Sequence, residues 1–158
     1  MALAMMTQQM ATGASVRPVL ESKGNMVWSV APEAMVFEAI SLMAEKSVGA
    51  LMVMSGHQPV GIISERDYAR KVILQGRSSK ETPVSEIMTS PVIFVTPGYT
   101  VDQCFYLMTE HRIRHLPVME GDRLSGILSI GDLVRATLAA QRETINQLTH
   151  YILGNYPA

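Results

Sequence analysis

A serine and an aspartate, three positions apart and preceded by a glycine, occur twice in this chain within one longer pattern. Residues 61–67 read Gly-Ile-Ile-Ser-Glu-Arg-Asp, and residues 126–132 read Gly-Ile-Leu-Ser-Ile-Gly-Asp. Each serine and aspartate could form a capping box, in which the two side chains bond backbone N–H groups at the start of a helix. For one copy alone, this structural role is the simplest interpretation.

The same arrangement could also bind a nucleoside. A helix N-terminus exposes unpaired N–H groups and carries partial positive charge. A carboxylate one turn into the helix can accept two hydrogen bonds from a vicinal diol, as an acidic residue does for ribose in dinucleotide folds. Gly61 and Gly126 allow a ligand to approach the backbone closely. The pattern therefore also predicts a ribose ligand at Asp67 and at Asp132, with the serine nearby.

The two copies belong to an internal repeat with a period of 65 residues. Residues 17–73 align with residues 82–138 without a gap, and 19 of the 57 aligned positions are identical. The identities fall on apolar and turn positions, which are the positions that dictate a fold. The chain is therefore a duplicated unit, and we expect the two copies to pack beside each other about a pseudo-twofold axis.

The order of elements within each repeat is predicted to be β-α-β-β-α. In the first repeat, the apolar spacing predicts a strand at 26–30, a helix around 35–43, a hairpin of 50–54 with 59–63, and a helix over 64–74. In the second repeat, it predicts a strand at 91–95, a helix capped by Thr100 and Gln103, a hairpin of 115–119 with 123–128, and a helix from Ser129.

Four segments follow from this organisation. We assign residues 1–16 to a flexible tail, 17–78 to the first repeat, 79–140 to the second repeat, and 141–158 to a C-terminal helical extension. Apolar residues continue into the extension at helical spacing, namely Leu138, Ile145, Leu148 and Ile152. The extension could contact a partner helix or fold back onto its own repeats, and the sequence does not favour either alternative.

Composition and charge exclude several classes of function. The net charge of −1, from 13 basic and 14 acidic residues, argues against a nucleic-acid-binding face. No apolar run approaches the ~18 residues that a membrane span needs, and the N-terminus lacks the basic region of a secretory signal. The single cysteine excludes an internal disulfide and a cysteine-rich zinc site, and no histidine spacing indicates a metal site. We therefore expect a cytoplasmic location.

The chain resembles a tandem pair of cystathionine-β-synthase (CBS) domains, also called a Bateman module. The resemblance covers residues 17 to about 140 and rests on the repeated Gly-Ile-apolar-Ser-x-x-Asp, on residues 114–118 (Arg-His-Leu-Pro-Val), and on the element order. Residues 64–71 are similar to bacterial stand-alone two-CBS proteins. The resemblance implies an α/β fold of two β-α-β-β-α repeats with two clefts that bind AMP, ADP, ATP, NAD or S-adenosylmethionine.

The resemblance also implies which residues form each cleft. In one cleft, the nucleoside would contact Ile127, Ser129 and Asp132, and the base would be walled by Lys23, Val27, Trp28, Val48 and Gly49. In the other cleft, the nucleoside would contact Ile62, Ser64 and Asp67, and the base would be walled by Met88, Val92, Ile93 and Ile113.

The predicted phosphate ligands differ between the repeats. Arg114 and His115 lie where family members place basic groups on phosphate, whereas the first repeat has Gly49 and Ala50 there. Arg66 could compensate in the Ser64 cleft. We therefore expect the two clefts to differ in affinity or in ligand. A solvated helix end would explain Arg112, but it explains Arg114 and His115 less well, because these two enter a strand.

Two other side chains have a simpler structural explanation. Trp28 is favoured as a core residue over a base-stacking residue on its type alone. Cys104 lies on an apolar helix face without a neighbouring histidine and is expected to be a buried, inert thiol.

The predicted function is a regulatory module that binds an adenine nucleotide and changes conformation to act on a separate protein, with the chain itself forming a homodimer. A structural dimerisation module with no physiological nucleotide is the alternative. An enzyme is disfavoured, since the sequence carries no Ser-His-Asp order, P-loop or metal set and no catalytic residue is predicted.

Overall fold

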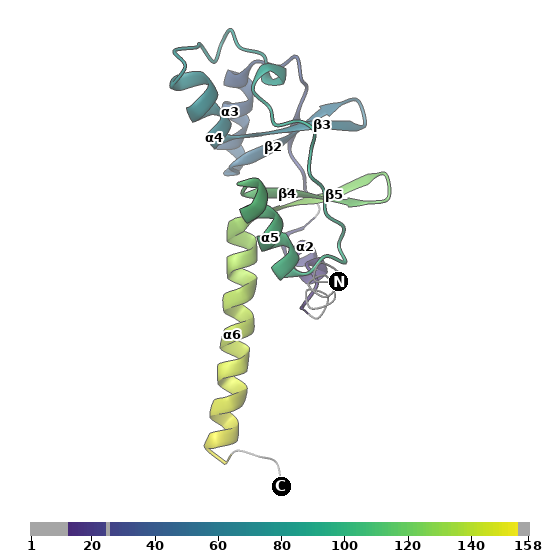
Figure 1. Ribbon diagram of the computed structural model, residues 1–158, viewed down its shortest axis with the longest axis vertical. Helices are drawn as coiled ribbons and strands as arrows, with labels where there is room; N and C mark the ends of the chain where they lie inside the picture. The colour runs from purple at the N-terminus through teal and green to yellow at the C-terminus, as the bar shows by residue number, and fades with distance from the viewer. Residues whose placement is uncertain (1–12, 25, 155–158) are drawn as a thin grey trace, which may run out of the picture. The chain divides into compact units, whose positions relative to one another are not determined.

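The computed structural model describes residues 13–24 and 26–154, and the structural statements below refer to these residues. The chain has a mixed α/β fold, as predicted, and ends in a long helix (Figure 1). In chain order, the elements are α2 (Arg17–Lys23), β1 (Ser29–Val30), α3 (Val36–Lys46), β2 (Ala50–Ser55), β3 (Gln58–Ser64), α4 (Glu65–Tyr68) with the π-helical turn η1 (Ala69–Ile73), the 3₁₀ turn η2 (Val84–Glu86), α5 (Val101–His111), β4 (His115–Glu120), β5 (Arg123–Ser129) and α6 (Ile130–Ile152).

The described residues form two compact units that do not coincide with the two sequence repeats. Unit 1 contains residues 13–24, 96–116 and 128–154, and unit 2 contains residues 26–95 and 117–127. The first segment of the first repeat, which includes α2, is thus grouped with the helices of the second repeat. The equivalent segment of the second repeat, which includes η2, is grouped with the first repeat.

The sheet of unit 2 has three strands in the order β1–β2–β3. β1 is parallel to β2, and β2 is antiparallel to β3, with a register shift between Val53 and Met54. β2 is buried along most of its length, which agrees with its continuous apolar sequence. The hairpin predicted for the first repeat is therefore confirmed, whereas β1 is shorter than the strand predicted over residues 26–30.

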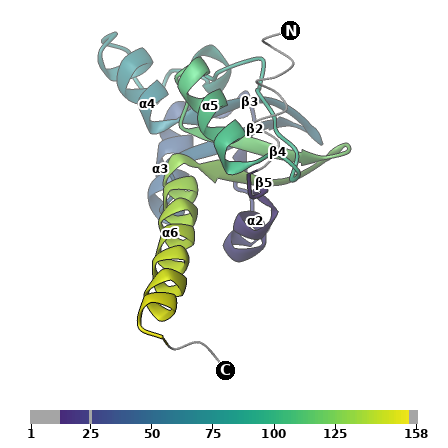
Figure 2. The same ribbon diagram turned by 60° about the horizontal axis from the view of Figure 1, so that its bottom comes forward.

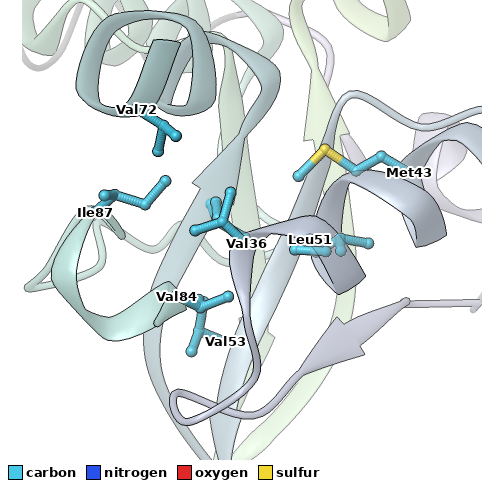
Figure 3. Close-up of a cluster of buried hydrophobic side chains, with 9 residues drawn as sticks. Val36, Met43, Leu51, Val53, Val72, Val84 and Ile87 are labelled. Carbon is cyan, nitrogen blue, oxygen red and sulfur yellow. The ribbon is translucent and has the colours of Figure 1, made fainter. Parts of the chain in front are cut away.

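An apolar cluster forms the core of unit 2 (Figure 3). It combines the inner face of α3 with β2, β3, η1 and the segment around η2, and its buried members are Val36, Ala39, Met43, Leu51, Val53, Ile63, Val72, Val84 and Ile87. The last two side chains come from the start of the second repeat. The first segment of the second repeat therefore contributes side chains to the hydrophobic core that is formed mainly by the first repeat.

Unit 1 is built from helices, and α6 contacts both α5 and α2. The predicted capping box of α5 is confirmed, because the Gln103 backbone N–H donates to Thr100 Oγ1 at 3.0 Å and the Thr100 N–H donates to Gln103 Oε1 at 2.9 Å. Cys104 is fully buried, as predicted, and burial raises the pKa of its thiol to about 11. Met108 and Leu133 are buried as well.

One prediction on secondary structure is wrong, and one helix was missed. Residues 91–95 do not form a regular strand, and only Val95 pairs, by a single parallel bridge with Val118. Pro91 has no N–H to donate to a strand ladder, which shortens the segment available for pairing. In addition, the helix α2 was not predicted.

The predicted flexible tail over residues 1–16 requires a correction at its C-terminal end. Val16 is fully buried, and its N–H donates to the Tyr99 carbonyl at 2.8 Å. The Val101 N–H donates to the Ala14 carbonyl at 3.0 Å. Residues 14–16 are therefore anchored at the start of α5, while residues 1–12 lie outside the described part of the chain.

The last helix is the longest element. α6 has 23 residues and runs well past α5 and α2 (Figures 1 and 2). Among residues 13–24 and 26–154, no helix combines the length and the apolar character needed to cross a membrane.

Candidate functional site

The first serine and aspartate lie where β3 ends and α4 begins. The Ser64 backbone N–H and hydroxyl donate to Asp67 Oδ2 at 2.9 Å and 3.0 Å, and the Asp67 N–H donates to Ser64 Oγ at 3.2 Å. The predicted capping box is therefore confirmed at this junction. It fixes the orientation of a carboxylate whose side chain is only 13% exposed.

The second serine and aspartate form the same geometry between β5 and α6. The Ser129 N–H donates to Asp132 Oδ2 at 2.8 Å, and the Asp132 N–H donates to Ser129 Oγ at 3.1 Å. The Asp132 side chain is 9% exposed. Each repeat thus holds one oriented, largely buried carboxylate at the first turn of a helix, as the sequence pattern predicts.

Basic side chains contact both carboxylates, but they come from different positions. Lys71, one turn further along, lies 3.0 Å from Asp67 Oδ1. Asp132 has two cationic partners, because Lys23 Nζ lies 2.7 Å from its Oδ2 and an Arg135 nitrogen lies 2.7 Å from its Oδ1. Asp67 is thus paired with a lysine of its own helical segment, whereas Asp132 is paired both with Arg135 of its own helix and with Lys23 of α2.

The ion pairs decide the protonation state of Asp132. Burial by itself would raise the pKa of this carboxyl group, but the hydrogen bonds from Lys23 and from the Ser129 N–H, together with the charge of Lys23, outweigh burial and lower the pKa below its ordinary value. Asp132 is therefore an anion at neutral pH and can act only as a hydrogen-bond acceptor.

A cavity of about 550 Å³ lies beside Asp132, between α2 and α6. Its size is within the range of small-molecule sites. Its wall combines two cations, one carboxylate, one hydroxyl and several small apolar side chains, and the lining residues are Pro18, Val19, Ser22, Lys23, Asp132, Arg135, Ala136 and Ala139. The cavity is therefore mixed in character, with its charged groups gathered at Asp132.

The segment from the second repeat that was predicted to flank the Ser64 site does lie beside β3. The Ile62 N–H donates to the Thr89 carbonyl at 3.1 Å, and the Thr89 N–H donates back at 2.8 Å. A Cβ placed on Gly61 would lie 2.5 Å from Met88 Sδ and 2.9 Å from its Cγ. Gly61 is therefore required for close packing of Met88, in addition to any approach of a ligand.

Trp28 packs against the core of unit 2, as the structural explanation of this residue predicts. The Lys46 ammonium group lies 4.4 Å from the centroid of its ring, in a cation–π contact. Val48 also packs against this core, and the Gly49 carbonyl accepts a hydrogen bond from the Glu65 N–H at 3.1 Å. Gly49 therefore lies at the end of β3, whereas the Trp28 carbonyl accepts a hydrogen bond from the Met52 N–H of β2 at 3.2 Å, and one face of the Trp28 ring already carries a cation.

The remaining predicted residues are distributed over both units. Unit 1 contains Ile113, Arg114 and His115, and unit 2 contains Val27, Arg66, Val92, Ile93 and Ile127. The Arg114 carbonyl accepts a hydrogen bond from the Ile130 N–H at 2.9 Å, which attaches the start of β4 to the start of α6. The assignment of these residues to two nucleotide clefts remains a prediction.

The sequence did not predict two of the residues near Asp132, and it predicted a different contact for a third. Ser22 and Arg135 were not predicted, and Lys23 was predicted at the base rather than on the carboxylate. Arg135 could have been found, since it lies three residues after Asp132 and is identical to Arg70 at the equivalent position of the first repeat. The contact of Lys23 joins positions 109 residues apart, and no local pattern indicates it.

The duplicated junctions, the hairpins and the element order define the family. The sequence profile of the CBS domain matches residues 16–73 and 84–139. The chain therefore belongs to the CBS-domain family and contains two CBS domains, as the resemblance implies.

Two curated relatives show the range of similar proteins. The mitochondrial CBS domain-containing protein CBSX3 of Arabidopsis thaliana is 43% identical over 152 residues, which cover 90% of this chain and 73% of the relative. The CBS domain-containing protein YhcV of Bacillus subtilis is 35% identical over 115 residues, which cover 73% of this chain and 81% of the relative. Similar proteins thus include a mitochondrial one.

Solved structures of CBS-domain proteins have the same fold. A protein with CBS domains from Burkholderia ambifaria is 50% identical with a TM-score of 0.78, and the match covers 81% of this chain and 96% of that one. The hexameric CBS-CP12 protein from bloom-forming cyanobacteria is 32% identical with a TM-score of 0.70, and the match covers 77% of this chain and 69% of that one. CBS-pair proteins are generally regulatory, commonly bind adenosine ligands and form oligomers.

Proposed function

We propose that this chain is a regulatory protein that binds an adenine nucleotide, AMP, ADP, ATP or NAD, at the Ser–Asp junctions of its two CBS domains. The observation that carries the proposal is the duplicated, oriented carboxylate at the first turn of a helix, with a cation in contact with it. A carboxylate is the usual acceptor for the two hydroxyls of a ribose, and the adjacent cations favour an anionic ligand.

The Asp132 carboxylate retains capacity for a ribose. A carboxylate offers about four acceptor positions, and three donors occupy them here, from Ser129, Lys23 and Arg135. A diol that donates two hydrogen bonds must therefore displace one donor. Arg135 is the simplest to displace, because its side chain is 73% exposed. Once displaced, its guanidinium group remains within reach of a phosphate of the same ligand.

The two sites are proposed to differ. Asp132 is accompanied by two cations and a cavity in unit 1, whereas Asp67 is accompanied by Lys71 of its own helical segment. We expect the Asp132 site to bind a phosphorylated ligand more tightly than the Asp67 site. The predicted phosphate ligands Arg114, His115 and Arg66 belong to this proposal, and their contribution follows from the family resemblance.

The proposed mechanism is a ligand-dependent change of conformation that a separate protein detects. A ligand can shift such an equilibrium only by the difference between its affinities for the two states. We place this difference at the contact of Lys23 with Asp132, because a ribose at Asp132 would compete with a lysine that connects α2 of the first repeat with α6 of the second. We further propose that the chain acts as a cytoplasmic homodimer without catalytic activity of its own.

A structural dimerisation module is the second candidate. It is favoured by one observation, which is that both carboxylates have a structural role, since each one caps a helix and contacts a cation of the chain itself.

Isothermal titration calorimetry with AMP, ATP and NAD, compared with adenosine, distinguishes the two functions. Saturable binding of a phosphorylated ligand, weakened by added salt more than the binding of adenosine, supports the regulatory function. The absence of binding by all four compounds at millimolar concentration would favour the structural module.

A further inference from the structure

The outer part of α6 carries a row of exposed apolar side chains. α6 continues to Ile152, and every residue from Leu138 to Gly154 is exposed. Large apolar side chains are exposed along its whole length, and their exposed fractions are 44% for Val134, 51% for Leu138, 61% for Ile145, 56% for Leu148 and 78% for Ile152. The alternative that this extension folds back onto its own repeats is therefore wrong for the described residues.

The spacing of these residues is that of a coiled coil. With Leu138, Ile145 and Ile152 at a positions, the d positions are Val134, Gln141 and Leu148. The row thus alternates in steps of four and three along one face, which is the pattern that lets two helices pack over several turns. The helix surface on the opposite side is polar, with Glu143, Asn146 and His150.

An isolated helix of this length does not keep its structure by propensity alone. The exposed part, residues 138–152, is about as long as the shortest helices that are marginally stable in water, and no other part of the described chain covers it. Helical stability in proteins comes mainly from packing of an apolar face. A second surface is therefore needed to stabilise the outer part of α6.

Gln141 identifies the kind of surface that fits. It is the one polar residue among the six a and d positions, and burial of an amide against an apolar partner would leave its donor and acceptor unsatisfied. An amide has both a donor and an acceptor, so two copies of the same glutamine can bond each other. This self-complementarity favours a second copy of this chain over an unrelated apolar groove.

The flanking charges favour a parallel arrangement. In a parallel pair, the g position faces the e position of the next heptad, which places Thr137 opposite Arg142 and Thr144 opposite Thr149 without like charges. An antiparallel pair centred on the row would place Arg142 near its own copy, and like charges at this distance are unfavourable.

We propose that α6 forms a parallel two-stranded coiled coil with α6 of a second copy through Val134, Leu138, Gln141, Ile145, Leu148 and Ile152. The inference rests on the homodimer of the proposed function and assigns its interface, and it does not depend on nucleotide binding. A polar residue within the core of a coiled coil fixes the register of the two helices.

Sedimentation velocity of the full chain provides the first test, with Ile145→Asp/Leu148→Asp as the disrupting variant. Asn146→Asp/Gln147→Asp is the matched control, because it adds the same charge on the outer face of the same turns. We expect wild type and control to be dimers and the disrupting variant to be at least tenfold weaker in dimerisation. If the wild type is monomeric at a protein concentration of about 100 µM, the result contradicts the homodimer as well as its interface. A disrupting variant that stays dimeric contradicts the interface only.

Disulfide crosslinking provides the second test and reports the orientation. Leu148→Cys at a d position is expected to give a covalent dimer on mild oxidation, whereas Glu143→Cys on the opposite face is not. Cys104 does not interfere, because it is fully buried. Equal crosslinking of the two variants would contradict the parallel coiled coil. Nucleotide titrations on the disrupting variant separate this proposal from the proposed function, because ligand binding is expected to persist without the helix pair.

Discussion

Lys23 donates a 2.7 Å hydrogen bond to Asp132, and the two residues are 109 positions apart. Lys23 is the last residue of α2, at the start of the first repeat, and Asp132 lies in the first turn of α6, in the second repeat. Both residues belong to unit 1, so the first segment of the first repeat packs with helices of the second repeat. The contact also places a basic group directly on the carboxylate that we propose as the ribose ligand.

Replacement of Lys23 by methionine, the residue at the equivalent position of the second repeat, should raise the pKa of Asp132. Burial raises the pKa of Asp132, and this effect would no longer be opposed by the hydrogen bond and the charge of Lys23. The loss of stability should be below ~1 kcal/mol, since Lys23 is partly exposed and solvent screens the pair. Carboxyl-resolved NMR titration and urea denaturation measure the two effects. Arg123→Met, an exposed position at the start of β5, serves as the control, and an unchanged pKa of Asp132 in Lys23→Met would show that Lys23 does not stabilise the anion.

Gly61 should tolerate no side chain while Met88 is present. A Cβ at Gly61 would contact Met88 Sδ at 2.5 Å, and we expect Gly61→Ala to lose ~1–3 kcal/mol of unfolding free energy through overpacking. In a Met88→Ala background the same substitution should cost at least ~1 kcal/mol less, because the two shortest contacts, with Met88 Sδ and Cγ, are gone and only the 3.2 Å contact with Cβ remains. Gly98→Ala is the control, because its Cβ would meet only Thr96 Oγ1 at 4.0 Å. Additive effects in the double variant would refute the assigned contact.

The two serine caps should contribute independently to stability. Ser64→Ala and Ser129→Ala each remove the acceptor for an aspartate N–H, and each should cost about 1 kcal/mol. Ser129→Thr should remain close to wild type, as threonine already caps α5. Chemical denaturation measures all three. A serine-to-alanine variant as stable as wild type would mean that the cap hydrogen bond contributes nothing at that junction.

Cys104 should make stability depend on pH in the alkaline range. Its pKa is about 11 in the folded protein, above the ~8.5 of an exposed thiol. Folding therefore favours the protonated thiol, and the resulting stability is complete below pH ~8.5 and is lost as the pH rises towards 11. Wild type should lose more stability than Cys104→Ala between these values. Parallel curves for the two proteins would contradict the raised pKa.

Local patterns predicted the parts of this protein that depend on local physics. Both Ser–Asp capping boxes, the β2–β3 and β4–β5 hairpins and the Thr100 cap of α5 follow from residues within a few positions of each other, and the structure confirms them. The 65-residue period predicted the duplication because identical apolar residues such as Leu51 and Leu116 occupy equivalent core positions.

Features that depend on distant contacts were not predictable in the same way. The helix α2 has seven residues and only Leu20 buried within it, so its sequence shows too little periodicity, and its packing on α6 is a tertiary contact. Residues 91–95 have strand-like composition, yet only Val95 finds a pairing partner. Likewise, the partner of Lys23 lies in the other repeat, and the alignment of repeats equates Lys23 with a methionine.

Ligand stoichiometry in aspartate variants tests the central claim most directly. Calorimetric titration of the wild type with the tightest of AMP, ATP and NAD should give two sites per chain. Asp67→Asn and Asp132→Asn, which keep the side-chain shape and remove the charge, should each retain one site, and the double variant should retain none. Asp102→Asn, in the first turn of α5, is the control and should keep both sites. Undiminished binding in the double variant would contradict the assignment of these carboxylates as ribose ligands.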